Sequence, residues 1–392
     1  PLMGGDVTLP FIASLVVDYS SRTIDNSIAG SYDVDATSLN WRVMDDLAIR
    51  VSEQTAVKAP DLGDLFLPQI TTFSTAADPC DYRYRDVGRN PEQRRANCDA
   101  EGIPADFISN VVNATAQGVT GGNPNLINEV ADTKSTGLVY QPSWWGDVLF
   151  GSASFAVDYI EIELTDYVTS YSLTQNMNAC YDYDTYPNSQ FCDSFSRDAE
   201  FQVDDFATGL INAGLIDFAT YVWKADWAFD VSELASFVSR ENVAMDLGSM
   251  AIRYRATQED FFASADSGAA EDLRSATGQF GNDEWFYDTQ FEWAYQDWYV
   301  YVQGNSRSGG VIDIDRVYDD EYLGYDGQPI FEFDGYTSWN GGVGYRVNDG
   351  TTLRVNVSNL FDYDGTEDDV FTPEADLLFY GRSVTASMNV RF

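Results

Sequence analysis

Apolar and polar residues alternate with a period of two along much of this chain. In one segment Leu353, Val355 and Val357 are apolar, whereas Arg354 and Asn356 between them are polar. Such alternation is typical of a β-strand with one face toward an apolar environment and the other toward a polar one. The pattern predicts about twelve strands, near residues 10–20, 28–43, 47–57, 132–142, 147–172, 214–229, 232–255, 283–294, 297–306, 334–346, 351–361 and 381–392.

The connections between these strands alternate between short and long. Short ones are expected at residues 45–46, 143–146, 230–231, 296–297 and 348–350, and long ones near 58–131, 173–213, 256–282, 307–333 and 362–380. Successive connections of an up-and-down sheet lie at opposite ends, so one end should carry tight turns and the other long loops. Outer-membrane barrels have this asymmetry. The pattern therefore predicts an all-β, transmembrane antiparallel up-and-down β-barrel rather than a soluble β-sandwich.

Aromatic residues are abundant, at 15% of the chain. Transmembrane barrels place such side chains in girdles at both membrane interfaces. Trp144 and Trp145 fall in one predicted turn, and Trp293 and Trp298 flank another. These four side chains are expected to be interface anchors.

The charge balance is strongly acidic, with 22 Lys and Arg against 63 Asp and Glu, a net charge of −41. This balance argues against a nucleic-acid partner, because phosphates would be repelled. It favours a solubilising acidic surface, and the alternatives are a funnel for cations or bound Ca²⁺. Candidate Ca²⁺ ligands are Asp362, Asp364, Glu367 and Asp368, which do not follow the EF-hand spacing. No other cofactor is indicated.

The four cysteines form two local pairs in polar segments, Cys80 with Cys98 and Cys180 with Cys192. Neither pair has the spacing of a zinc or redox site, so two disulfides in an oxidising compartment are predicted. Both pairs fall in long loops. The chain contains no histidine, which excludes Ser-His-Asp and Cys-His catalysis, so we do not expect an enzyme.

The final strand is regular to the last residue. Val384, Ala386, Met388 and Val390 alternate with polar residues, and the chain ends on Phe392. An amphipathic terminal strand closed by an aromatic residue resembles the signal that barrel-assembly machinery recognises in outer-membrane proteins. The four apolar residues would then face lipid.

Other segments resemble the TonB-dependent outer-membrane receptors. Residues 43–66 resemble the strand ending in "R-A-P-x-L-x-E-L-F", with Lys58 in place of arginine, and residues 121–143 resemble "G-N-P-x-L-x-P-E", with Asn128 in place of proline. Residues 78–104 resemble a cysteine-bearing loop of many members. Residues 357–362 are similar to the penultimate-strand "V-x-N-L-F-D". The similarity runs over nearly the whole chain in the family's order.

The resemblance implies a multi-pass β-barrel in the outer membrane of a Gram-negative bacterium, with residues 1–392 forming the C-terminal part of a 22-stranded barrel. It implies TonB-energised uptake of a small-molecule nutrient, such as siderophore-iron or an oligosaccharide. Implied partners are outer-membrane lipid and lipopolysaccharide, the TonB complex through a plug absent from this chain, and barrel-assembly machinery through the last strand. The alternatives are a passive porin-like channel and an acidic β-rich surface binding protein.

Three tyrosines are candidate substrate contacts. Tyr181, Tyr183 and Tyr186 lie in the second cysteine-bearing loop, where they could stack on a sugar or an aromatic siderophore. The alternative role for all three is packing within the loop or at the membrane interface.

Overall fold

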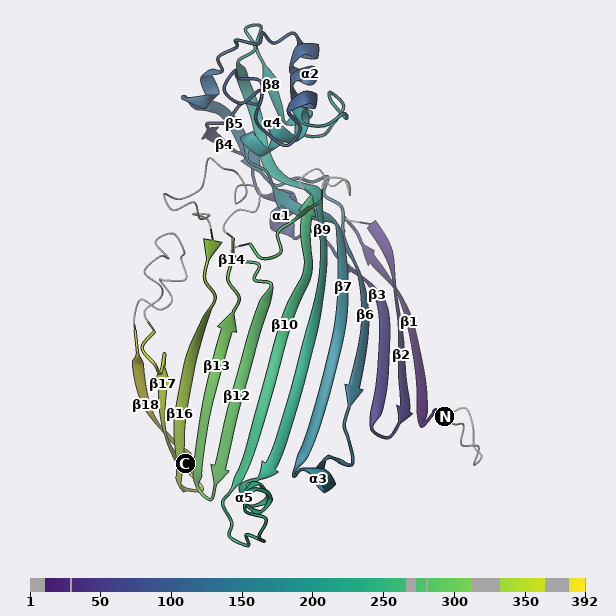
Figure 1. The fold of residues 1–392 in the computed structure, drawn as a ribbon. Coiled ribbons are helices and arrows are strands. Elements are labelled where there is room, and N and C mark those ends of the chain that lie inside the picture. The colour runs from purple at the N-terminus through teal and green to yellow at the C-terminus, as the bar shows by residue number, and fades with distance from the viewer. Residues whose placement is uncertain are drawn as a thin grey trace.

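Twelve long strands form one antiparallel sheet in a computed structural model that describes residues 11–28, 30–265, 273–279, 281–311, 332–363 and 381–391 (Figure 1). Each strand pairs with its neighbours along the chain, so the predicted all-β, up-and-down order is confirmed. The strands are β1 (Ser14–Asn26), β2 (Gly30–Met44), β3 (Leu47–Lys58), β6 (Glu129–Tyr140), β7 (Ser152–Ser170), β9 (Val203–Asp230), β10 (Ser249–Ala265), β12 (Trp285–Tyr295), β13 (Trp298–Arg307), β16 (Tyr336–Asn348), β17 (Thr351–Ser358) and β18 (Ser383–Val390). We call this sheet the wall. Within the described residues β1 and β18 are each paired on one side only, so the wall is open.

Shorter elements occupy the connections. The helices are α1 (Leu62–Phe66), α2 (Pro91–Glu101), α3 (Trp145–Val148), α4 (Leu173–Tyr181) and α5 (Val231–Ser239), with 3-10 turns at Asn110–Val112 and Cys192–Ser194. The short strands are β4 (Ile70–Ser74), β5 (Ala116–Gly121), β8 (Phe195–Arg197), β11 (Arg274–Ser275), β14 (Gly310–Val311) and β15 (Glu332–Phe333).

The two ends of the wall differ. At one end, which we call the turn end, tight turns join β2 to β3, β12 to β13 and β16 to β17. Figure 1 shows both ends of the chain near this end, together with α3 and α5. At the opposite end, which we call the loop end, α2, α4, β4, β5 and β8 gather above the strands.

Two of the tight turns predicted at the turn end are wrong. The connection at Asp230-Val231 is instead helix α5 followed by residues 240–248, and the strand expected from residue 232 begins at Ser249. Helix formation is favoured there by a capping box, in which Asp230 caps the helix and the Glu233 carboxylate accepts from the Asp230 amide at 3.3 Å. Similarly, the turn expected at residues 143–146 is replaced by a longer connection that includes α3, and the next strand begins only at Ser152.

The strict alternation of short and long connections is also wrong at the loop end. β1 and β2 are joined there by residues 27–29 alone. Ile28 donates its amide to the Asn26 side chain at 2.9 Å, which closes a tight turn. The connections 59–128 and 171–202 are long, as expected, but they contain regular elements rather than open loops.

The register of the wall separates two faces. One row of cross-strand partners is apolar, and it runs through Trp41, Ile49, Leu138, Val157 and Trp223. We call this side the apolar face. The opposite side, the polar face, carries Arg50 on β3 and Asp158 on β7, which are joined by hydrogen bonds of 2.8 and 2.6 Å. The apolar side chains are largely unburied, with Val355 44% exposed and Trp223 40% exposed.

Candidate functional site

The two long connections at the loop end fold together into one unit. The strand β5 pairs with β4 and, in parallel, with the upper part of β9, where Val119 lies opposite Ala207. From the second connection, β8 pairs with β9 so that Phe195 lies opposite Phe206. We call residues 59–128 and 171–202, with the upper end of β9, the loop subdomain. β9 connects it to the wall because this strand extends through both (Figure 1).

Both predicted disulfides are present in the loop subdomain. Cys80 is bonded to Cys98, and Cys180 to Cys192. Each bond closes its own connection, yet three of the four cysteines are buried in one shared core, which also contains Ile103, Phe107, Tyr171 and Phe191. The disulfides therefore stabilise a common hydrophobic core.

Buried ion pairs also hold the two connections together. Arg94 of α2 binds Asp182 at the end of α4, with 2.6 Å between Nη2 and Oδ2 and both side chains 4% exposed. Arg197 of β8 donates to both carboxylate oxygens of Asp78, at 2.8 and 2.7 Å. Fully buried pairs of this kind contribute most when their geometry is bidentate and their remaining groups are satisfied. The sequence contained no signal for this pairing, because each partner lies in a different connection.

The three candidate tyrosines lie in this subdomain but differ in exposure. Tyr181 is 1% exposed, and its hydroxyl contacts Glu101 and accepts from Arg197 Nε at 2.9 Å. The Tyr181 ring belongs to the core, which fits the alternative role of packing within the loop, and ligand contact by Tyr181 stays an untested prediction. Burial raises the pKa of Tyr181 well above its usual value.

Tyr183 and Tyr186 remain candidates for ligand contact because both are half-buried. The Tyr183 hydroxyl accepts from Arg89 at 2.8 Å, and the Tyr186 hydroxyl donates to Glu101 at 3.2 Å. Burial, together with the nearby Glu101 carboxylate, raises the pKa of Tyr186 to about 12. The Tyr186 ring stacks on Tyr181 with centroids 5.4 Å apart, so only one side of the ring is free of that neighbour.

Two of the segments compared with receptor motifs meet at the loop end of β3 and β6. Lys58 and Glu129 are register partners and form an ion pair of 2.9 Å. Just beyond them, the Gly122 amide donates to the Leu67 carbonyl at 2.9 Å, and the Asn123 amide to Asp64 at 2.8 Å. A side chain at Gly122 would lie 2.7 Å from the Leu67 backbone. The motif residues thus fix how the first long connection leaves the wall.

The polar face carries a layer of ion pairs in its middle. Asp158 lies within 2.6 Å of Arg50 and 3.7 Å of Lys224, so it joins three strands. Further along, Arg255 pairs with Asp226 at 2.7 Å, and Arg253 with Glu292 at 2.6 Å. The arginines of this layer are partly exposed, as expected for a surface that contacts water or a polar partner, whereas Asp158 is buried.

The character of the two faces inverts toward the loop end. On the polar face, Ile162 lies opposite Phe218, which lies opposite Phe262, with the two phenylalanine centroids 6.3 Å apart. On the apolar face at the same level, Glu163 lies opposite Asp217. The inversion indicates that the wall leaves its apolar surroundings here. We call the inverted part of the polar face the apolar collar; it comprises Ile160, Ile162, Leu164, Ile216, Phe218 and Phe262.

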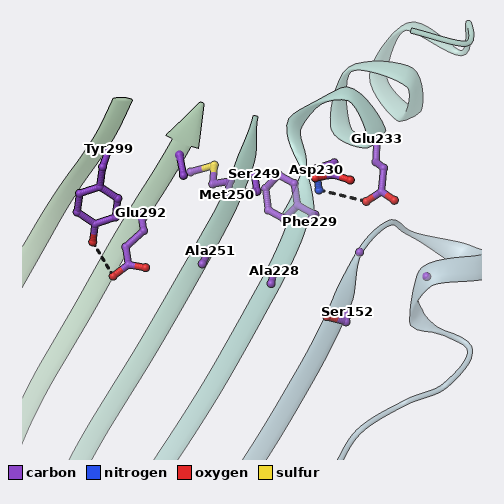
Figure 2. A pocket seen from close by; sticks show the side chains of 13 residues that line it. Ser152, Ala228, Phe229, Asp230, Glu233, Ser249, Met250, Ala251, Glu292 and Tyr299 are labelled. Atoms are coloured by element: carbon purple, nitrogen blue, oxygen red, sulfur yellow. Dashed lines mark hydrogen bonds between the residues drawn. The ribbon is translucent and has the colours of Figure 1, made fainter. Parts of the chain in front are cut away.

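A cavity of about 530 Å³ lies on the polar face near the turn end (Figure 2). Small side chains of three neighbouring strands line it, including Ser152, Ala228 and Ala251. At its edge, Tyr299 donates to Glu292 at 2.9 Å. Helix α5 contributes Glu233 at the opposite edge, as Figure 2 shows.

Only one of the four expected Ca²⁺ ligands, Asp362, lies among the described residues. Asp362 accepts from the Arg382 amide at 2.8 Å and lies 3.7 Å from its guanidinium. Asp364, Glu367 and Asp368 lie outside the described residues, as does Phe392. Within the described ranges, no group of three or more acidic, cysteine or histidine side chains is arranged to hold a metal ion.

Comparison with known proteins gives a consistent result. A family model described as "TonB dependent receptor-like, beta-barrel" matches residues 5–360. Curated proteins give no match. Among solved structures, a double mutant of the ferric enterobactin receptor PfeA from Pseudomonas aeruginosa superposes with a TM-score of 0.57 and 12% identity, over 97% of this chain and 43% of that one. The siderophore receptor PirA from Acinetobacter baumannii gives 0.56 and 14%, over 97% and 44%.

The present chain thus spans less than half the length of these receptors, and the identities support a shared fold alone. Within the described residues, no helix is long and apolar enough to cross a membrane. The match of the family model covers most of the sequence, and the resemblance predicted from sequence motifs is confirmed. This chain belongs to the family of TonB-dependent receptor-like β-barrels.

Proposed function

We propose that the chain forms the C-terminal part of the wall, and outer loops, of a receptor in the outer membrane of a Gram-negative bacterium. The receptor would take up a small-molecule nutrient with energy from the TonB complex, acting through a plug inside the barrel. The apolar face would meet lipid and lipopolysaccharide, and the polar face would line the lumen. The open edges of β1 and β18 would pair with further strands, because unpaired backbone groups are not tolerated in hydrocarbon.

The loop end would face the outside of the cell. Two observations support this orientation: the disulfides lie there, and the apolar face becomes acidic at this end, where Glu163 and Asp217 are paired in register. Disulfides persist in oxidising, extracytoplasmic surroundings. The turn end would then face the periplasm, and barrel-assembly machinery would recognise β18 from that side.

The single observation that carries the proposal is the loop subdomain. A passive channel needs an open mouth, whereas this chain joins its two longest connections by buried ion pairs and closes each of them with a disulfide of its own. A preorganised surface above a barrel is suited to capturing a ligand, since little ordering entropy is lost on binding. The apolar collar beneath it would offer a nutrient an apolar contact on its way inward.

The nutrient is proposed to be a siderophore or a compound of similar size, as the two solved structures named above are of a ferric enterobactin receptor and a siderophore receptor. An oligosaccharide is the alternative. Three arginines of the polar face, Arg50, Arg253 and Arg255, are paired with carboxylates, and the chain carries a net charge of −41. These charges disfavour a strongly anionic cargo.

Uptake in paired host strains tests the proposal. The receptor would be expressed in isogenic strains with and without TonB, and uptake of radiolabelled neutral hydroxamate, anionic catecholate and oligosaccharide probes would be measured. We expect uptake of at least one probe to require TonB. TonB-independent entry of all probes would instead support a passive channel. A folded monomer in detergent-free buffer would support a surface binding protein.

A further inference from the structure

The turn end carries an exposed apolar surface beside the wall. Helix α5 and the segment after it present Phe237, Val238 and Met245, which are 50%, 73% and 67% exposed. Helix α3 adds Trp144 and Val148, which are 44% and 63% exposed. We call these five residues the rim patch. Periplasmic connections of such barrels are usually short turns, so an 18-residue connection of this composition (residues 231–248) requires an explanation.

The rim patch is continuous with the apolar face of the wall. Phe150, which follows α3, contacts Trp227 and Phe229 of β9 with ring centroids 4.8 and 5.0 Å apart, and Phe237 of α5 at 5.3 Å. Trp227 belongs to the apolar face, because it lies opposite Ile252 in the register. An unbroken aromatic cluster, in which Phe150 and Phe229 are buried, therefore leads from the apolar face of the wall to the exposed Phe237 of the helix.

Helix α3 is likewise connected to the apolar face of the wall by aromatic contacts. The ring of Trp145 packs against Phe155 and Trp227 at centroid distances of 5.4 and 6.1 Å. Both of these partners lie on the apolar face. The indole of Trp144 lies next to that of Trp145, at 5.8 Å, and donates its Nε1–H to the Tyr140 hydroxyl of β6 at 2.9 Å, so these rings also contact the neighbouring wall strand.

The polar side of α5 points the other way. Glu233 accepts from the Asp230 amide and lines the cavity on the polar face (Figure 2). Ser236 accepts from the Val243 amide at 2.9 Å, which folds the following segment back onto the helix. The polar side of the helix therefore continues the polar face of the wall, and its apolar side continues the apolar face.

We propose that the rim patch lies in the headgroup region of the adjacent membrane leaflet and anchors the turn end of the wall to lipid. This inference rests on the proposed placement of the apolar face in the membrane. The partner is a phospholipid surface, because the patch continues a lipid-facing surface and consists of large apolar and aromatic residues. Connection 231–248 contains one basic residue, Arg240, against the acidic Glu233, Glu241 and Asp246. Binding is therefore apolar in origin and requires no anionic lipid.

Spin labels placed in the rim patch measure directly whether it lies in lipid or in water. The structure shows no free cysteine among the described residues, since all four are disulfide-bonded, so single cysteines can be introduced and labelled selectively. Val238→Cys and Met245→Cys would be labelled in the receptor purified from outer membranes and reconstituted in phosphatidylcholine nanodiscs. Val355→Cys on the apolar face serves as the lipid control and Glu241→Cys as the water control. The readout is label accessibility to oxygen, which enters lipid, and to a nickel chelate, which does not.

We expect labels at 238 and 245 to be more accessible to oxygen than to nickel, as at 355, with no change when anionic lipid is added. Nickel access at 238 and 245 with a protected label at 355 would overturn the anchor and leave the membrane placement intact. Access to neither reagent would indicate a protein partner and would also overturn it. Nickel access at 355 would instead refute the placement of the wall itself.

Discussion

The loop subdomain and the wall bury their side chains in opposite ways. The largest fully buried side chains of the described residues are Tyr181, Ile103, Leu173, Met177, Asp78, Asp81, Pro79, Cys80, Cys98, Cys180 and Ser109. Every one of them lies in the loop subdomain. Along the wall, by contrast, large apolar side chains are open, with Val384 and Met388 both 65% exposed.

This difference in burial indicates that the two regions are suited to different surroundings. The subdomain has the closed core, disulfides and buried ion pairs of a small domain in water. Among the described residues no protein layer covers the apolar face of the wall, and we propose that lipid meets it. Even the charges differ, since Arg197 is 4% exposed whereas Arg50 is 47% exposed. We therefore expect a substitution that unfolds one region to leave the other folded.

The largest effect is expected from Arg197→Ala. The change would leave the Asp78 carboxylate buried without its partner, because Asp78 is fully buried and bound at both oxygens. We expect the free energy of unfolding of the subdomain to fall by about 3–5 kcal/mol. Limited proteolysis across a urea series measures this loss, while heat-dependent mobility in SDS gels reports the wall separately.

Arg95→Ala is the matched control for that variant. Arg95 lies in α2 of the same subdomain and pairs with Asp86 at 2.7 Å, but the two side chains are 41% and 72% exposed. An exposed pair contributes about 1 kcal/mol or less. Equal losses in the two variants would contradict the view that the subdomain has a core of its own.

The next effect concerns the disulfides. Replacing Cys80 and Cys98 with serine removes a link across 18 residues. Loop-closure entropy gives an expected loss of about 3 kcal/mol in subdomain stability. The same proteolysis assay measures it, and dithiothreitol treatment of the unmodified receptor should give a loss at least as large, because it reduces both disulfides. Unchanged mobility of the wall in SDS gels is expected; a wall that unfolds as well would show that the two regions are coupled.

A smaller effect is expected when charge is placed on the wall. Val355 lies on the apolar face of β17, several residues from the turn end. Val355→Arg should destabilise the wall by about 2 kcal/mol, since charge on the lipid face costs most near the bilayer centre. Urea unfolding in lipid vesicles would measure this. Thr385→Arg, on the polar face one register pair away, should change stability little, and a cost equal to that of Val355→Arg would reverse the assignment of faces.

The smallest effect over an accessible pH range comes from Tyr186. Burial and Glu101 raise its pKa to about 12 in the folded subdomain, above the value of about 10 in an unfolded chain. The folded state keeps a proton that the unfolded state loses. Its stabilising effect is therefore complete below about pH 10 and is lost as the pH rises toward 12. Tyrosinate absorbance would follow this titration. Glu101→Gln should lower the pKa of Tyr186, whereas an unchanged titration after Tyr186→Phe would exclude this residue as the source.

The sequence by itself determined the strands of the wall and their order. Alternation such as that of Leu353, Val355 and Val357 specifies which side chains share a face, because successive residues of a strand point to opposite sides. The cysteine pairs could be matched for a similar reason, since each bond is local. The prediction failed where apolar residues belong to a helix. Residues 232–255 were predicted to be one strand, but the apolar residues of Val231–Ser239 recur at helical spacing, and the capping pair Asp230 and Glu233 marks the start of α5.

The tertiary structure alone decided how the loops combine and what Tyr181 does. Arg94 and Asp182, or Arg197 and Asp78, are far apart in sequence, and no local pattern selects one carboxylate among 63 acidic residues. From the sequence, Tyr181 was a candidate either for ligand contact or for packing within the loop, and contacts between α2, α4 and β8 bury it. Local propensity fixes strands and turns, whereas burial depends on long-range contacts that form only when both connections meet above β9.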